Sequence, residues 1–201
     1  MHTRALFVAA IAFALVAVGC AKEDDAAKAA LRAGGFGEPA AAELSRMELT
    51  KEEVDNLVKA RQNGLDEASL TSMVKAMHEE DLRFVIGTET QLLTQAGMGA
   101  TAITQLVQMG AIPRWADDMR ALKEFGVDDV TIVEIAKLRF VENKEILSGG
   151  EYTRLKQFGI SDAGLLTFAR KGGTPQQLET LARELAMGKP EAQAMQTAGI
   201  K

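Results

Sequence analysis

The stretch GLDEASLTSMV, from Gly64 to Val74, recurs in altered form three more times along the 201-residue chain. The other copies are GMGATAITQLV from Gly97, GVDDVTIVEIA from Gly126 and GISDAGLLTFA from Gly159, and all four align without a gap. Successive copies therefore begin at intervals of about 30 residues, which is typical of proteins built from repeated supersecondary units. These copies decide the fold.

Each copy has the pattern expected where one helix ends and a second begins. The glycine supplies the left-handed backbone conformation that ends a helix, and the aliphatic residue after it is expected to pack beneath the turn. Asp66, Asp128 and Ser161 stand where a side-chain oxygen accepts hydrogen bonds from the free amides of the second helix. Gly99 occupies this position in the second copy, so we expect a looser helix start there.

The first helix of each pair has start signals of its own. Thr50 with Glu53, and Ser148 with Glu151, have the spacing of a capping box, in which each residue bonds the backbone of the other. Thr174 is predicted to cap a further helix. Three prolines are predicted to be first helical residues, where the missing amide hydrogen costs nothing: Pro113, Pro175 and Pro190.

The second helices carry apolar residues at helical spacing, so each has one apolar stripe. One hairpin of two helices cannot bury its stripe alone, and successive hairpins must therefore stack. The sequence predicts an all-α domain of stacked helical hairpins over residues 48–201, either a short α-solenoid or a compact helical bundle. The final MQTAGI, residues 195–200, is interpreted as the first half of a fifth copy.

Residues 20–47 contain Gly34, Gly35, Gly37 and Pro39 and few large apolar side chains. This composition favours a flexible tether, with a short helix around residues 26–32.

Residues 1–19 have the features of an export signal. Arg4 is followed by ALFVAAIAFALVAV, residues 5–18, which contains no polar side chain. This run is shorter than the roughly 20 residues needed to cross a bilayer, and it fits a secretory signal peptide over residues 1–19.

The segment AVGC, residues 17–20, resembles the lipobox after which bacterial lipoproteins are cleaved and acylated. Val18, Gly19 and Cys20 match it, whereas Ala17 stands where leucine is usual. The resemblance implies a lipid attached to Cys20, and Ala21 implies the outer membrane of a bacterial envelope, facing the periplasm. A lone thiol in an oxidising compartment favours this interpretation. The alternative is an ordinary secreted protein with a cysteine near its cleavage site.

Charge argues against nucleic acid as a partner. Without residues 1–19 the chain has 22 basic and 28 acidic side chains, a net charge of −6, whereas phosphate binding depends on Lys and Arg. The GMG turn at Gly97 resembles the phosphate-binding turn of a helix-hairpin-helix, but Asp66 and Asp128 replace its second glycine in two other copies and would repel phosphate.

The remaining motifs indicate no recognised chemistry. LSGGE, residues 147–151, resembles the signature of ATP-binding cassette ATPases, but the chain lacks their G-x-x-x-x-G-K-[ST] phosphate loop. His78 is the only histidine beyond the signal, and zinc binding on a helix needs a second one a turn away. We predict no catalytic residue, no metal and no cofactor.

Two functions remain as hypotheses. The first is a lipid-anchored envelope protein whose helical repeats bind a protein or peptide without catalysis. The alternative is an envelope hydrolase, or an accessory to one, that uses carboxylates in a groove.

Overall fold

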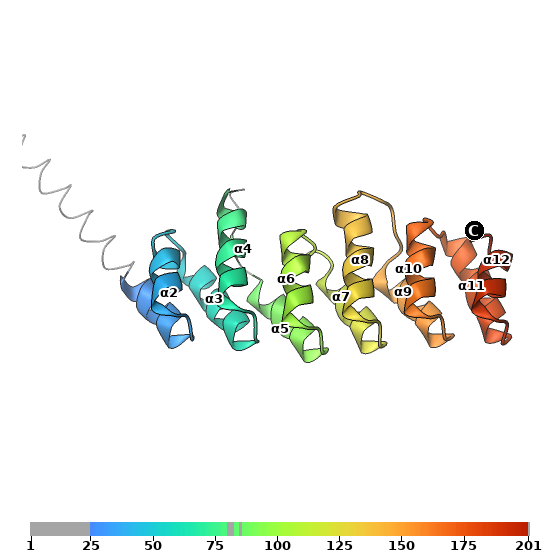
Figure 1. Ribbon diagram of the computed structural model, residues 1–201, viewed down its shortest axis with the longest axis horizontal. Helices are drawn as coiled ribbons and strands as arrows, with labels where there is room; N and C mark the ends of the chain where they lie inside the picture. Colours follow the sequence, from blue (N-terminus) through green and yellow to red (C-terminus); the bar gives the residue numbers. More distant parts are fainter. Residues whose placement is uncertain (1–24, 80–82, 85, 201) are drawn as a thin grey trace, which may run out of the picture. The chain divides into compact units, whose positions relative to one another are not determined.

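The structure is a computed structural model that describes residues 25–79, 83, 84 and 86–200. The described residues form helices and turns, with no strand among them. They divide into two compact units, one ending at Gly87 and one beginning at Thr88. Each unit is all-α and consists of packed helical hairpins, as predicted (Figure 1).

Unit 1 consists of two hairpins. A helix over residues 25–33 precedes α2 (Glu38–Ser45), and α3 (Lys51–Gln62) precedes α4 (Glu67–Glu79). Helix α4 packs against both α2 and α3. Each helix contributes apolar side chains that are fully buried, among them Leu31, Leu44, Leu57 and Leu70.

The tether expected over residues 20–47 is a folded hairpin over residues 25–45. Gly35 has a positive φ of 92° and ends the first helix, and Phe36 after it is buried. The segment therefore has the same glycine–apolar turn as the four copies. Its glycines and Pro39, which lies in the first turn of α2, serve helix ends rather than a flexible chain.

Unit 2 repeats the hairpin along the chain. Neighbouring first helices pack together, α7 on α9 and α9 on α11, and so do neighbouring second helices, α6 on α8 and α8 on α10. This succession of neighbour contacts makes unit 2 a stack of hairpins (Figure 1). The helices are α5 (Gly87–Gln95), whose first residue still belongs to unit 1, α6 (Ala100–Gln108), α7 (Ala116–Glu124), α8 (Asp129–Phe140), α9 (Gly149–Gln157), α10 (Asp162–Arg170), α11 (Pro175–Ala186) and α12 (Glu191–Thr197).

Three expectations for unit 2 are wrong in detail. The chain end is not the first half of a new copy, because α11 and α12 already form a hairpin that turns at Gly188, with φ 76°. Pro190 is the N-cap of α12 rather than its first residue. Pro113 lies before α7, in a turn that leads to the N-cap Trp115. Pro175 is the first residue of α11.

One glycine joins the two helices of each hairpin. The number of residues between successive glycines of this kind alternates between a shorter and a longer interval along the chain. The interval from Gly64 to Gly97 is one of the longer ones, and the interval from Gly97 to Gly126 is one of the shorter ones. Asn56 and Asp118, at equivalent places two hairpins apart, each accept a 2.8 Å hydrogen bond from the first amide of the next first helix. The structural period is therefore a pair of hairpins. The turn glycines are Gly35, Gly64, Gly97, Gly126, Gly159 and Gly188.

Candidate functional site

The four turn glycines found in the sequence lie at helix ends with left-handed backbone conformations. Their φ angles run from 79° at Gly126 to 95° at Gly64. At each turn the amide after the glycine donates to a carbonyl near the end of the preceding helix, as in the 3.2 Å bond from Leu65 to Ala60. The apolar residue after each glycine is buried. The other two predicted turn glycines, Gly97 and Gly159, have φ angles of 89° and 84°.

The side chains expected to cap helices lie at helix starts. Asp66 and Asp128 accept backbone hydrogen bonds of 2.8 and 2.7 Å from the residue three places on, and Ser161 accepts one of 3.0 Å. Hydrogen bonds from Ser69 hold the pKa of Asp66 below its usual value. Thr50, Ser148 and Thr174 each begin a reciprocal capping box.

Carboxylates link successive hairpins at these same turns. Glu67 accepts a hydrogen bond from the amide of Gly37, and within unit 2 Asp129 accepts one from the amide of Gly99 in the preceding hairpin. In the same way, Asp162 accepts a 2.9 Å hydrogen bond from the amide of Asp128 in the preceding hairpin. Each of these acids is the first residue of a second helix, where a negative charge also suits the helix dipole. Gly99, which has no capping side chain, is therefore held from the next hairpin.

Burial alone would raise the pKa of Asp162, but hydrogen bonds from Lys156 and from the Asp128 amide hold it below its usual value. The ion pair of Lys156 with Asp162 is 2.6 Å long, and Lys123 makes an equal pair with Asp129 one hairpin earlier. Both acids thus serve as structural links between neighbouring hairpins.

Exposed apolar side chains occupy one repeat position in unit 2. Phe125, Phe158 and Met187 each stand directly before a turn glycine, in three successive hairpins, with 45%, 39% and 59% of their surface exposed. In unit 1 the same position holds Gly34 and Asn63. A bulky apolar residue is therefore not a requirement of the turn.

We call the four glycine turns of unit 2 the turn edge, residues 93–100, 122–129, 155–162 and 184–191. It carries three basic and six acidic side chains, a net charge of −3. The turn edge thus combines a row of exposed apolar residues with an acidic surround. The basic residues are Lys123, Lys156 and Lys189, and the acidic ones are Glu124, Asp128, Asp129, Asp162, Glu184 and Glu191.

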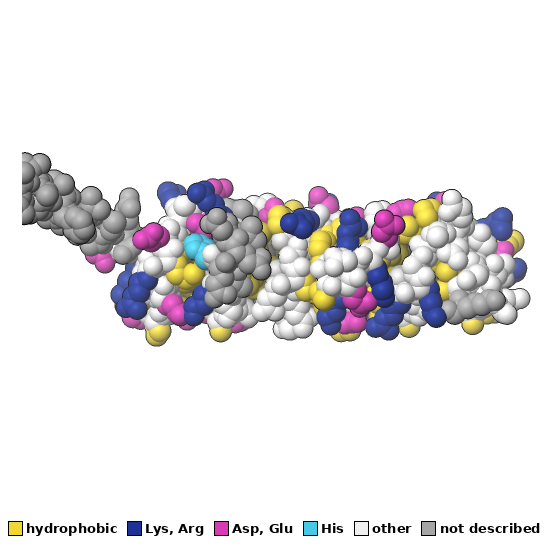
Figure 2. Space-filling view, turned by 90° about the horizontal axis from the view of Figure 1, so that it is seen from above, with side chains coloured by type: hydrophobic (Ala, Val, Ile, Leu, Met, Phe, Trp, Pro, Cys, Tyr) yellow, Lys and Arg dark blue, Asp and Glu magenta, His cyan; other side chains and the backbone are white. Residues whose placement is uncertain are grey.

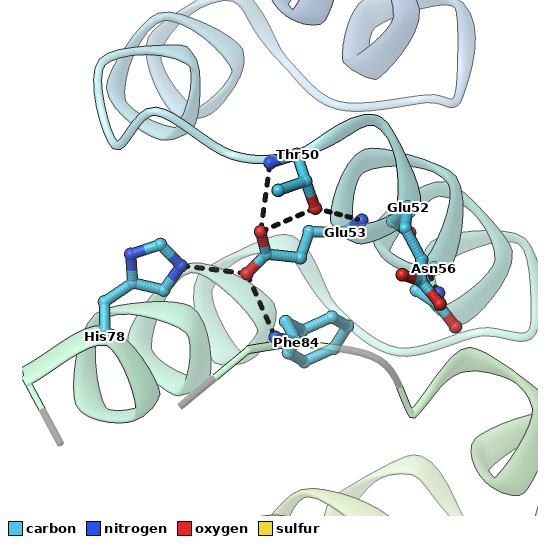
Figure 3. A network of polar contacts seen from close by, with 6 residues as sticks. All are labelled: Thr50, Glu52, Glu53, Asn56, His78 and Phe84. Atoms are coloured by element: carbon cyan, nitrogen blue, oxygen red, sulfur yellow. Dashed lines mark hydrogen bonds and ion pairs between the residues drawn. The ribbon is translucent and has the colours of Figure 1, made fainter. Parts of the chain in front are cut away.

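A buried carboxylate in unit 1 is the most heavily bonded side chain of the described molecule (Figure 3). Glu53 is 2% exposed and closes the capping box of α3 by accepting bonds from the amide and hydroxyl of Thr50, at 3.0 and 2.8 Å. Its other oxygen lies 3.0 Å from Nε2 of His78 and accepts a 3.1 Å bond from the amide of Phe84.

The environment of Glu53 favours a structural role for its charge. Burial would raise the pKa of Glu53, but the hydrogen bonds from Thr50, His78 and Phe84 together hold it below its usual value. A general acid needs the opposite shift, toward the working pH. Because both oxygens already accept bonds, the carboxylate joins the start of α3, the end of α4 and the segment before α5.

Among the cavities lined by described residues of unit 2, two open ones bring together no free catalytic groups. The larger, about 510 Å³, lies between α6 and α8; its acids are Asp129 and Glu134, and each is ion-paired. The smaller, about 400 Å³, contains Glu145 as its one acid. Glycoside hydrolysis needs two facing carboxyl groups. Within the described part of the chain, no cluster of three His, Cys, Asp or Glu side chains could hold a metal.

Cys20 and the predicted signal, residues 1–19, lie outside the described residues. Among the helices that are described, none combines the length and the apolar composition needed to span a bilayer.

Comparison with known families gives no matching family model, and comparison with curated proteins gives no matching protein.

Sequence reasoning found the turns and caps but missed the apolar row and the burial of Glu53. The row has a sequence signal, because Phe125 and Phe158 occupy the same column of the aligned copies. The Glu53 network has none, because its partners His78 and Phe84 lie on other segments, far away along the chain.

Proposed function

We propose that this chain is a lipid-anchored protein of the bacterial envelope, at the outer membrane, whose helical repeats bind a protein partner without catalysis. The partner docks on the turn edge of unit 2. The observation that carries the proposal is the exposure of Phe125, Phe158 and Met187 at one position of three successive hairpins. Attachment through Cys20 is supported by the lipobox-like segment of the sequence.

The composition of the turn edge supports a protein partner with apolar residues and a basic surround. Aromatic and methionine side chains are enriched where proteins bind one another, and a few of them supply most of the binding energy. The net charge of −3 on this edge favours a basic partner, which it would also attract over distance.

The spacing of the row supports a helical partner. Packed helices lie roughly 8–10 Å apart, so side chains at one position of neighbouring hairpins recur at about that distance. An α-helix advances about 10.5 Å in seven residues. A basic amphipathic helix with apolar residues seven positions apart would therefore meet Phe125, Phe158 and Met187 in turn.

The proposal is tested by affinity capture from detergent-solubilised envelope with three forms of the protein. The wild type and Val130→Ser, which removes an apolar side chain that is 73% exposed but lies on α8 outside the row, should recover the same partner. The triple variant Phe125→Ser, Phe158→Ser, Met187→Ser should recover at least tenfold less, because two or three apolar anchors are lost. Equal recovery by the triple variant, or no specific partner in any capture, would contradict the proposal.

The anchor is tested separately by mass spectrometry of the mature amino terminus. Cys20 should carry a diacylglycerol thioether and an amide-linked acyl chain, and Cys20→Ala should remain unprocessed and unmodified. An unmodified cysteine in the wild type would refute the anchor but would leave the binding proposal standing.

A further inference from the structure

Unit 2 has a second edge, at the opposite ends of its helices, with the opposite charge. This connection edge comprises the segments that lead from each second helix to the next first helix, residues 106–116, 138–149 and 169–176. The helices between the two edges have 9 to 12 residues in α7–α11. At 1.5 Å per residue, helices of this length span about 14–18 Å. Figure 1 shows the two edges at opposite ends of the helices.

The connection edge carries five basic and two acidic side chains, a net charge of +3, in a chain whose net charge is −5. The turn edge carries −3, so the charge of unit 2 is separated along its helix axes. The basic residues are Arg114, Arg139, Lys144, Arg170 and Lys171, and the acidic ones are Glu142 and Glu145.

Three of these cations are available to a partner. Arg114, Arg139 and Lys171 are exposed and make no ion pair with any described residue, whereas Lys144 pairs with Glu142 and Arg170 with Glu134. The guanidinium of Arg139 lies 5.9 Å from the ring centres of both Trp115 and Phe140, so it is held in place without being neutralised.

Apolar side chains lie beside these cations. Val141 is 59% exposed, Pro113 is exposed, and Ile146 and Leu147 are half-buried at the mouth of the 400 Å³ cavity. Figure 2, which looks onto the molecule from above, shows hydrophobic surface next to Lys and Arg side chains over this part of the chain. An exposed surface that is both basic and apolar matches an anionic bilayer, whose headgroups attract Lys and Arg and whose interface accepts apolar side chains.

We infer that the connection edge of unit 2 binds the surface of an anionic lipid bilayer. The charge argument depends on unit 2 alone. A second argument rests on the proposed lipid at Cys20: residue 25, the first that the structure describes, lies in a helix and is five residue steps from Cys20, so at most about 18 Å of chain separates the two. A chain attached so closely has a high local concentration at the membrane, and weak surface contacts then suffice.

The inference is tested by vesicle sedimentation with the chain from Ala21 to Lys201, which contains every described residue and lacks Cys20. The protein should sediment with vesicles of phosphatidylglycerol and phosphatidylcholine at 1:3 but not with phosphatidylcholine alone, and about 0.5 M NaCl should release it. Arg114→Gln with Lys171→Gln should weaken binding about 30-fold, at roughly 1 kcal/mol per cation near an anionic surface. Adding Arg139→Gln should weaken it about fivefold further, by the same roughly 1 kcal/mol.

The control is Arg154→Gln with Arg183→Gln, which removes two exposed, ion-paired cations from the last turns of α9 and α11, away from the connection edge. It should bind as the wild type does, and circular dichroism should show equal helix content in all forms. Equal weakening in the control, equal binding to both vesicles, or binding to neither would overturn the inference. The serine variants of the turn edge should retain full vesicle binding, so failure of one proposal leaves the other testable.

Discussion

The same capping motif is used in two different ways in the two units. In unit 1 the glutamate of the Thr50–Glu53 box is 2% exposed and also bonds groups on two other segments. In unit 2 the glutamate of the Ser148–Glu151 box is half-buried, and its bonds to the amide and hydroxyl of Ser148 stay within the box. An identical sequence spacing therefore produces a tertiary junction in one unit and a local helix start in the other.

The two capping glutamates differ because different groups contact the start of α3 and the start of α9. In unit 1 the end of α4 brings His78 to Glu53, and the backbone at Phe84 adds a donor (Figure 3). In unit 2 the start of α9 is fixed by backbone proximity, because the amide of Gly149 donates to Asp118 and a Cβ at Gly149 would lie 2.5 Å from the Asp118 carbonyl oxygen. The capping glutamate therefore holds several segments together in unit 1, whereas in unit 2 it bonds only the start of its own helix.

The largest effect is expected from Glu53→Ala. It removes the acceptor of four hydrogen bonds and leaves the buried amide of Phe84 unpaired, so the free energy of unfolding should fall by about 3 kcal/mol. Glu151→Ala should cost about 1 kcal/mol, the usual value of a cap. Urea unfolding followed by circular dichroism measures both, and equal losses would show that the two boxes do not differ.

The next effect is expected from Gly149→Ala, which should lower the free energy of unfolding by about 2 kcal/mol because backbone atoms of Asp118 would have to move. Gly150→Ala is the control, since no atom lies within 4 Å of a Cβ there. That variant should be stabilised by about 0.5–1 kcal/mol through its helix propensity. Similar outcomes at both positions would mean that backbone proximity does not fix the start of α9.

A smaller effect is expected in the pH dependence of stability. The pKa of Glu53 is lower in the folded protein than in the unfolded chain, so its charge stabilises the fold above the unfolded value of 4.5. This contribution is lost as the pH falls through the lower folded pKa. Glu53→Gln should therefore lose less stability than the wild type between pH 6 and pH 3, measured by urea unfolding at each pH, and parallel losses would contradict the assignment.

The smallest effect is expected from Thr174→Ala in the third capping box, which pairs Thr174 with the neutral Gln177. Loss of this exposed cap should lower the free energy of unfolding by about 0.5–1 kcal/mol. Because neither partner is charged, the loss should be the same at pH 6 and pH 3. A loss that changes with pH would point to a charged neighbour of this box.

Local rules were sufficient for much of the fold. A glycine before an apolar residue, followed by a capping side chain, identifies a hairpin turn from consecutive residues alone, as at Gly126 and Asp128. The same rule also fits Gly35, which Phe36 follows, in the segment predicted to be a tether. It does not identify the turn at Gly188, because Lys189 takes the apolar position there.

Long-range features could not be derived in the same way. The burial of Glu53 depends on His78 and Phe84, which belong to later segments of the chain. The aligned copies place Phe125 and Phe158 in one column, but the exposure of that column follows from tertiary packing, which no local pattern encodes. The charge separation between the two edges of unit 2 becomes visible only once the chain segments are assigned to helix ends.

The shorter and longer intervals between turn glycines alternate along the chain. This alternation determines how many residues can be deleted or inserted without disturbing the packing of the hairpins. Removing residues 65–126 would join Gly64 to Val127 and place Asp129 where Glu67 stands, so a carboxylate would again face Gly37. Removing one hairpin would instead bring together helix ends whose connecting segments differ in length. We therefore expect shortened or lengthened forms of the protein to fold only when whole pairs of hairpins are removed or added.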